Sequence, residues 1–554
     1  MYKTQQNKNI DMKKNLIFWI ALTAVIVVTG TGCEKGDLLS NPNVASQTSV
    51  VPVSLILNHM TYSLYAGGGV VDSRPGSYNE TPWDQLYIWQ QYYVSNYPYY
   101  RGNNFYNWSV SATEYDLLKY AGLLGSQAYR QFSNYTNKYY GLAKFFQAYS
   151  LIWYTQRVGD IPAKQAGNPT AYPTPTYNSQ HDVYQYALAL LDSANTILGA
   201  YNALPTTKPG AAFDASGDIF GLTNLQWQKV VNTYRLRVLV SLSKRATDNA
   251  DLNIPQQFAT ILANPSQYPV MTSNSDNMVF KYNAAFNQYP IFLHGWAPYN
   301  GYANICNTYL NLTTSTKDPR TFVTATPAPG QIKAGKLVGD FTAYVGADIS
   351  TAIGTIQTNS ANSGMYSFAN YSRYYTSSSA ANAEPFILIG YPELCFNIAE
   401  GLNRGWSTTG TAATWYTNGI KASLSNYGLS QGQTLTIGDV GGTTLGTVTV
   451  DINTFLTNVA YAGNNNAGLT QILQQKYVAF FNNSGWEAYY NWRRTGIPAF
   501  SQGGAGIGTP SNLIPRRFQY GSDEALANTT NNKAAIQSQY GGTDDISQNM
   551  WLVK

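Results

Sequence analysis

The sequence predicts a mainly α-helical protein in which paired helices form a scaffold, a loop-rich region lies across that scaffold, and a small β-hairpin is added. Three observations support this fold class. Apolar residues recur at three- and four-residue spacing in several long segments, as in amphipathic helices. Residues from about 265 to 384 are instead rich in Gly, Ser, Thr, Asn, Pro and Tyr. The segment TLTIGDVGGTTLGTVTV, residues 434–450, has the pattern of a hairpin.

Three of the predicted helices lie in the first half of the chain. The first ends at Gly159, with Pro162 soon after it, and Ser179 is the predicted N-cap of the second. Asp182 follows Ser179 by three residues, in a capping-box-like position. The buried faces are expected at Leu142, Phe145, Tyr149 and Ile152 of the first helix, at Val183, Tyr186, Leu190 and Ala194 of the second, and at Trp227, Val231, Tyr234 and Val238 of the third.

The second half contains further helices. One begins at about Pro392, because proline suits the first helical position, and residues 412–428 supply its antiparallel neighbour. Residues 469–498 predict one helix, a break at Gly485 and a second short helix. The helix pairs suggest a solenoid-like array, but no repeat of fixed period is present.

The N-terminal segment has the features of a secretory signal. Lys13 and Lys14 precede an apolar run of 13 residues, 16–28, which is shorter than the roughly 20 residues that cross a bilayer. The small residues Gly-Thr-Gly then lead directly to Cys33, as in the lipobox of bacterial lipoproteins. We therefore expect residues 1–32 to be removed and Cys33 to be lipidated, since two or three acyl chains make a durable anchor. The alternative is cleavage nearby, with Cys33 left as a free thiol.

Composition limits the class of ligand. Residues 1–32 carry four Lys and one Asp, so the net charge of +5 falls to about +2 without them, which is too balanced to predict nucleic-acid binding. Charged residues make up 11% of the chain, against about a quarter in typical domains, and tyrosine occurs 45 times. Neutral polar groups and aromatic rings suit neutral ligands such as sugars. A compositional habit of the source organism's secreted proteins explains them equally well.

No residue pattern predicts catalysis. Glu393 and Glu400 lie seven residues apart on one helical face, about 10.5 Å along the axis, and paired carboxylates serve glycosidases. We nevertheless expect both, and Arg493 and Arg494, to be structural. The three histidines are scattered, and no metal-ligand spacing, phosphate loop or Gly-x-Ser-x-Gly elbow occurs. We therefore predict a protein that is not an enzyme and holds no metal or cofactor.

Two aromatic stretches are the binding candidates. WDQLYIWQQYYVSNYPYYRGNNFYNW, residues 83–108, combines rings and amides, and HGWAPYNGYANICN, residues 294–307, is the second. The ordinary alternative is that rings at helical spacing are core residues. The candidate contacts are Trp83, Tyr87, Trp89 and Tyr92 in the first stretch, and Trp296, Tyr299 and Asn300 in the second.

Seven segments together resemble the SusD/RagB family of Bacteroidota outer-membrane lipoproteins, particularly its SusD-like subgroup. In order along the chain they are DLLSNPN after Cys33, FFQAYSLIWYTQRVGDIP, PTYNSQHDVYQYALALLDSA, WQKVVNTYRLRVLVSLSKR, ILIGYPELCFNIAEGLNRGW with YTNGIKASLSNYG, KYVAFFNNSGWEAYYNWRRTGIP, and IPRRFQYGSDEALANTTN. The chain departs from the family at Gly30, where Leu is commonest, and in the glycine-rich hairpin near Gly441, which resembles an insertion.

The resemblance implies a fold, a partner and a function. The fold is a tetratricopeptide-like scaffold of helix pairs with an irregular subdomain that presents the ligand site. Family members sit at the cell surface as a lid on a SusC-like TonB-dependent transporter of the outer membrane, capture a glycan or in some members a peptide, and deliver it for uptake. A secreted glycoside hydrolase and a purely structural subunit are the remaining alternatives.

The expected organisation of the chain follows from these patterns. It comprises a lipoprotein signal peptide (1–32), a lipidated tether (33–50), the first part of the helical scaffold (51–264), an irregular loop-rich subdomain (265–384), and the second part of the scaffold (385–554) with the hairpin insertion near 434–450.

Overall fold

The computed structural model describes residues 49–66, 85–106, 115–282, 289, 297–375, 384–508 and 513–554. Its contacts divide the chain into two units, Met1–Val51 and Pro52–Lys554, and the fold below is that of the second unit. The expected signal segment, Cys33, Trp83 and Trp296 lie outside the described residues. Within the described residues, no helix combines the length and apolarity needed to span a membrane.

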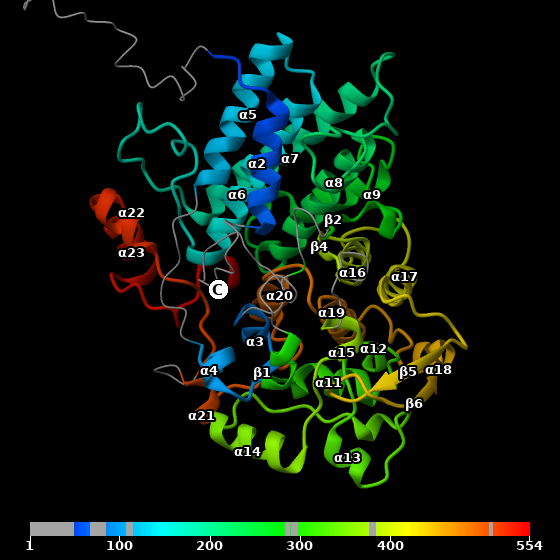
Figure 1. The fold of residues 1–554 in the computed structure, drawn as a ribbon. Coiled ribbons are helices and arrows are strands. Elements are labelled where there is room, and N and C mark those ends of the chain that lie inside the picture. The colour runs from blue at the N-terminus through cyan, green and yellow to red at the C-terminus, as the bar shows by residue number, and fades with distance from the viewer. Residues whose placement is uncertain are drawn as a thin grey trace, which may run out of the picture. The chain divides into compact units, whose positions relative to one another are not determined.

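A series of antiparallel helices forms the first part of this unit, and each of the larger ones packs against its neighbour in the chain. Figure 1 shows α2, α5, α6 and α7 side by side. The series comprises α2 (Val53–Ala66), α5 (Asp116–Phe132), α6 (Lys138–Val158), α7 (Gln180–Asn202), α8 (Asn224–Ser241) and α9 (Ile254–Ala263). Between α2 and α5 lie the short elements α3 (Gln85–Trp89), β1 (Tyr93–Ser95) and α4 (Pro98–Arg101).

Helix α6 is more deeply buried than its pattern predicts. Its four expected core residues are buried, but so is nearly every residue from Leu142 to Val158. The reason is that α5 and α7 both pack on it, while the C-terminal part of the chain covers its end. There, the Phe518 amide donates to the Arg157 carbonyl (2.9 Å) and the Tyr540 hydroxyl donates to the Val158 carbonyl (2.7 Å). The helix ends at Gly159, as predicted.

Side-chain caps begin the next two helices. The Ser179 hydroxyl accepts from the Asp182 amide (3.2 Å), which confirms the predicted N-cap of α7. Tyr186 was predicted to lie on the buried face of α7, but it is only half-buried, so that prediction was wrong. The fully buried ring is that of Tyr184 instead. All four expected residues of α8 are buried, and Thr223 begins that helix with a complete capping box.

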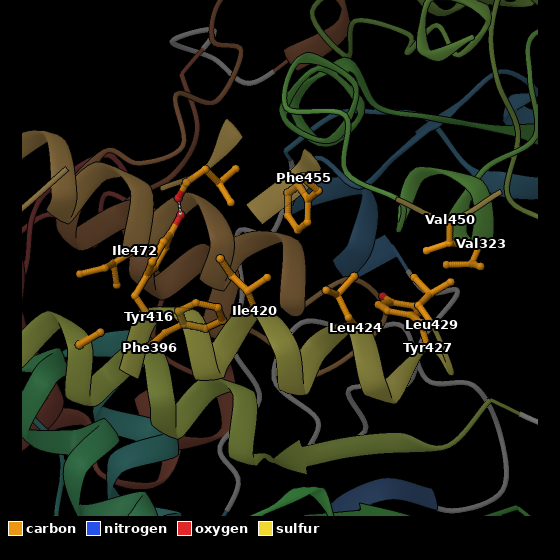
Figure 2. Close-up of a cluster of buried hydrophobic side chains, with 12 residues drawn as sticks. Val323, Phe396, Tyr416, Ile420, Leu424, Tyr427, Leu429, Val450, Phe455 and Ile472 are labelled. Carbon is orange, nitrogen blue, oxygen red and sulfur yellow. Dashed lines mark hydrogen bonds between the residues drawn. The ribbon is translucent and has the colours of Figure 1, made fainter. Parts of the chain in front are cut away.

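The second helical part centres on a close pair of helices. Helix α16 packs along α17, and a methyl group added at Gly419 of α17 would lie only 2.8 Å from the Phe396 ring of α16. Figure 2 shows the buried cluster between these helices and their neighbours, in which Tyr416, Ile420 and Leu424 of α17 face Phe455 and Ile472. The elements are β4 (Phe386–Ile389), α16 (Tyr391–Asn403), α17 (Ala412–Asn426), α18 (Ile452–Asn458), α19 (Asn466–Ala479), α20 (Glu487–Thr495), α21 (Gly504–Ile507), α22 (Ser522–Ala527) and α23 (Thr529–Tyr540).

The region between the two helical parts consists of short elements. They are η5 (Asn274–Asp276), β2 (Met278–Phe280), η6 (Ala297–Tyr302), β3 (Ala303–Ile305), α11 (Asn307–Ser315), α12 (Thr321–Thr324), α13 (Pro329–Lys333), α14 (Ile353–Ser363) and α15 (Tyr371–Tyr374). Strand β3 of this region pairs with β1 of the first helical part, and β2 pairs with β4 of the second, both antiparallel. The region is therefore hydrogen-bonded to both helical parts. The predicted hairpin is confirmed as β5 (Thr434–Gly438) and β6 (Thr444–Thr449).

Both described cysteines are free and buried. Burial raises the pKa of the Cys306 and Cys395 thiols to about 12, so each behaves as a small apolar residue.

Buried charges join four helices. Glu400 of α16 is fully buried and accepts two hydrogen bonds from Arg494 of α20 (2.5 and 2.9 Å) and further bonds from Arg404. Glu393 accepts from Arg237 of α8. Lys476 of α19 donates to the side-chain oxygens of Asn397 and Asn491 (2.6 and 2.8 Å). The structural interpretation of the two glutamates and of Arg494 is therefore confirmed.

Removing the carboxylate of Glu400 should destabilise the protein strongly. Glu400→Ala leaves the buried Arg494 guanidinium without its counter-charge, and breaking such a pair costs about 3–5 kcal/mol. Urea unfolding measures the loss. The control is Asp248→Asn, which removes the ion pair of the exposed Asp248 carboxylate with Arg245 (3.0 Å) and should cost less than about 1 kcal/mol. Equal, small losses in both variants would contradict the buried network.

Acid should weaken the same network. Burial opposes the ionisation of Glu400, but the guanidinium groups of Arg494 and Arg404 outweigh it and lower the pKa to about 2, from 4.5 in the unfolded chain. The pair therefore stabilises the fold fully above pH 4.5, and on the order of 3 kcal/mol is lost as the pH falls from 4.5 towards 2. Urea unfolding across this range should show a smaller pH dependence for Glu400→Gln than for the unmodified protein.

Candidate functional site

The two aromatic stretches singled out in the sequence meet in the structure. Strand β1 pairs with β3, with Tyr93 opposite Ile305 and Ser95 opposite Ala303. The pairing continues one residue further, where the Asn96 amide donates to the Tyr302 carbonyl (3.1 Å). Segments about 200 residues apart in the sequence are thereby held side by side.

The Asn96 side chain locks this junction. Only 4% of Asn96 is exposed, and its Nδ2 donates to the Gly301 carbonyl (3.0 Å), to Asn304 Oδ1 (2.8 Å) and to Ser360 Oγ (3.2 Å). One amide therefore connects β1, η6 and α14. Because buried amides are costly to leave unpaired, this arrangement fixes the register of the two segments.

The loop that follows β1 is held equally firmly. Asn104 accepts from the Ser95 amide (2.7 Å) and donates to its carbonyl (3.0 Å), while the Ser95 hydroxyl donates to the Gly102 carbonyl (2.6 Å). Pro98 begins the single turn of α4, and Gly102 ends it with a φ of 67°, a conformation that favours glycine. Tyr97 and Tyr99 are thus presented on a short, pinned turn.

Three tyrosines form the accessible part of this junction, which we call the tyrosine platform: Tyr97, Tyr99 and Tyr302. The rings of Tyr97 and Tyr302 stack with centroids 4.9 Å apart and planes inclined by 26°. Tyr99 is 82% exposed, the largest exposure among the large hydrophobic residues that the structure describes. The side chains that hold the platform together, Asn96, Asn104 and Ser95, are neutral.

Three of the predicted contact residues lie beneath the platform instead of on it. Tyr87, Trp89 and Tyr92 are at most 3% exposed. Tyr92 stacks on Tyr477 at 4.5 Å and donates to its carbonyl oxygen (2.7 Å), and Trp89 donates to the Phe105 carbonyl (2.9 Å). Burial raises the pKa of Tyr92 well above its usual value. Their rings belong to the core, as the alternative interpretation expected, and they offer no open face for stacking.

The remaining predicted residues have different places. Asn300 lies in η6 and its amide donates to the Val440 carbonyl in the turn between β5 and β6, so this hairpin contacts the junction. Tyr299 lies in the same short helix. Trp83 and Trp296 lie outside the described residues.

The contact residues predicted from the sequence do not include Tyr97, Tyr99 and Tyr302, although all three lie within the two aromatic stretches. The helical spacing applied to residues 83–108 fails after Trp89, because the chain changes to strand at Tyr93. A signal was present in Tyr97-Pro98, since a residue before proline is driven towards extended backbone, and Tyr97 has φ −146° and ψ 99°.

The two carboxylates considered as a catalytic pair, Glu393 and Glu400, do not form an open site. Glu393 and Glu400 are both engaged by arginines in the core, away from solvent. No group of three His, Cys, Asp or Glu side chains in the described ranges is placed to hold a metal ion. The platform presents tyrosine ring faces, which suit binding by stacking.

Comparison with known proteins agrees with this geometry. Residues 45–521 match a family model described as starch-binding associating with outer membrane. No curated protein sequence matches.

Solved structures match over nearly the whole chain. A SusD homologue from Bacteroides fragilis NCTC 9343 is 24% identical with a TM-score of 0.74, covering 91% of this chain and 100% of its own. A second SusD homologue from the same strain is 27% identical with a TM-score of 0.68, covering 91% and 99%. A chitin-binding SusD homologue from Flavobacterium johnsoniae is 20% identical with a TM-score of 0.62, covering 90% and 97%.

The family model covers most of the chain, and the helical fold and non-catalytic platform agree with it. The chain belongs to the SusD-like family of outer-membrane-associated, starch- and nutrient-binding proteins.

Proposed function

We propose that this protein captures a neutral oligosaccharide on the tyrosine platform at the cell surface and delivers it to a SusC-like TonB-dependent transporter. The observation that carries the proposal is the exposed Tyr99 ring beside the stacked pair of Tyr97 and Tyr302. Aromatic faces stack on the apolar face of a pyranose, and each ring contributes about 1 kcal/mol. Affinity for a short sugar is therefore expected in the micromolar to millimolar range.

Preorganisation supports this assignment. The hydrogen bonds of Asn96 and Asn104 already hold both platform segments, so a sugar would not have to order them on binding. The family description names starch, and one structural relative is described as chitin-binding. Both ligands are chains of pyranose rings. Trp296, immediately before η6, and Trp83 remain candidates for further stacking rings.

The anchor and the partner complete the proposal. Cys33 carries the lipid that holds the protein on the outer membrane, and residues 33–50 form the tether. The family assignment supports transfer to a β-barrel transporter as the step after capture. Peptide capture is the second candidate function, and the neutral side chains that hold the platform, Asn96, Asn104 and Ser95, favour a sugar over a charged peptide chain.

Binding should depend on the platform rings. In the protein produced from residue 34 onward, Tyr99→Ala and Tyr302→Ala should each weaken binding of maltooligosaccharides or N-acetylglucosamine oligosaccharides roughly fivefold, because each removes one stacking face. Isothermal titration calorimetry measures the affinity, and reducing-sugar assays of the same samples should show no release.

Tyr135→Ala is the matched control, because Tyr135 is also an exposed ring stacked on another tyrosine (Tyr129, 4.4 Å) but lies outside the platform. Equal losses in the control and the platform variants would contradict the site. If the protein bound unmodified peptides and no sugars, the ligand would be a peptide and the sugar proposal would be wrong.

A further inference from the structure

A second concave surface lies apart from the tyrosine platform. A groove of about 590 Å³ runs between the start of α5, the loop of residues 162–175 and helix α22. Its volume is within the range of small-ligand sites, and none of the platform residues lines it. Figure 1 shows where α5 and α22, which carry two of its walls, lie in the fold. We call it the proline groove, because Pro162, Pro169, Pro173 and Pro175 line it.

The loop that forms one wall is closed and stiff. Its ends are joined by a two-way backbone bridge between Ile161 and Asn178 (3.2 and 2.9 Å). Within it, the Thr176 amide donates to Gln165 Oε1 (2.9 Å). The four prolines restrict its backbone further, since each fixes its own φ.

The same loop is tied to the two other walls. The Tyr115 hydroxyl, next to α5, donates to the Pro162 carbonyl (3.0 Å), and Asn528 Nδ2, after α22, donates to the Pro175 carbonyl (2.7 Å). Asn532 of α23 donates to the Tyr177 hydroxyl (2.9 Å). The groove therefore exists before any ligand binds, which lowers the entropic cost of occupying it.

Carboxylates outnumber cations on its surface. Asp116 and Asp523 are exposed at the rim, and neither forms an ion pair with any described residue. Lys119 is the one cation among the described lining residues, and its Nζ lies over the ring of Tyr120, 5.5 Å from the centroid. The rim thus presents unbalanced negative charge.

The floor of the groove holds a buried carboxyl group. Glu524 is 7% exposed, and its two oxygens accept from the hydroxyls of Tyr154 (2.5 Å) and Tyr177. Burial raises the pKa of Glu524. Its two hydrogen-bond donors are neutral tyrosine hydroxyls, and no described cation offsets the charge of the carboxylate. A buried carboxylate without a cation is costly, and a cationic ligand would relieve that cost.

Apolar surface accompanies these charges. The Tyr172 ring is 44% exposed and lines the groove together with the prolines. A ligand that fits must therefore combine a positive charge with an apolar ring face. Amino sugars have both, because a protonated amine is attached directly to a pyranose whose axial hydrogens form an apolar face.

We propose that the proline groove binds an oligosaccharide with free, protonated amino groups, with the ammonium groups near Asp116, Asp523 and Glu524 and a sugar ring against Tyr172. This inference rests on the proposed function only in taking a sugar as the ligand. The protein then has a neutral and a cationic sugar site, formed by different residues.

The test compares two trimers with the same sugar backbone, of which only the one without N-acetyl groups carries protonated amines. The protein from residue 34 onward is titrated by calorimetry with the glucosamine trimer and with the N-acetylglucosamine trimer, at low salt and mildly acidic pH. The double variant Asp116→Asn/Asp523→Asn, whose changes are exposed, should bind the glucosamine trimer roughly tenfold more weakly, and added salt should weaken binding to the unmodified protein. Asp248→Asn, also an exposed carboxylate, is the matched control and should leave binding unchanged.

The outcomes separate this site from the platform. Tyr99→Ala should leave the affinity for the glucosamine trimer at the groove unchanged while weakening that for the neutral sugar. The inference would be overturned if the unmodified protein and the double variant both bound the two trimers with equal affinity, or if the glucosamine trimer did not bind at all. Neither result would contradict the proposed platform site. Binding of a lysine-containing peptide that is lost in the double variant, with no binding of the amino sugar, would also overturn it.

Discussion

The buried charge network around Glu400 is the constraint on which the rest of the structure depends. Few charges are available in this chain, and those in the core must be paired because an isolated buried ion is prohibitively costly. Arg494 and Glu400 join α20 to α16, and Arg237 and Glu393 join α8 to α16. The two helical parts of the chain are thereby fixed to each other, and the segments that form the platform are supported on that base.

The core beneath the platform shows two uses that the fold makes of tyrosine. Tyr92, Tyr309, Tyr477 and Phe481 pack ring against ring, with centroids 4.5 to 6.5 Å apart. A tyrosine hydroxyl can also satisfy a backbone carbonyl, as that of Tyr92 does for Tyr477. Tyrosine therefore fills volume in this core and adds a hydrogen bond to a carbonyl in the last turn of α19.

The two surfaces differ in the physical interactions they offer. The platform presents tyrosine rings that are held in place by neutral side chains. The proline groove combines carboxylates at its rim with a tyrosine and several prolines. At its open side these carboxylates attract cations over about one Debye length. In both, hydrogen bonds between remote segments hold the walls in place, so the sites are products of the same tertiary packing.

The sequence by itself determined the helices with strong caps and periodicity, the break at Gly485, the hairpin and the family. It did so because local hydrogen bonds and apolar spacing act over a few residues. It also identified the two aromatic stretches as binding candidates. It could not say which rings are exposed: Tyr87 and Tyr99 are chemically identical, and only the tertiary packing buries one and exposes the other. The β1–β3 pairing, the Asn96 lock and the proline groove likewise depend on contacts between distant segments, which no local pattern records.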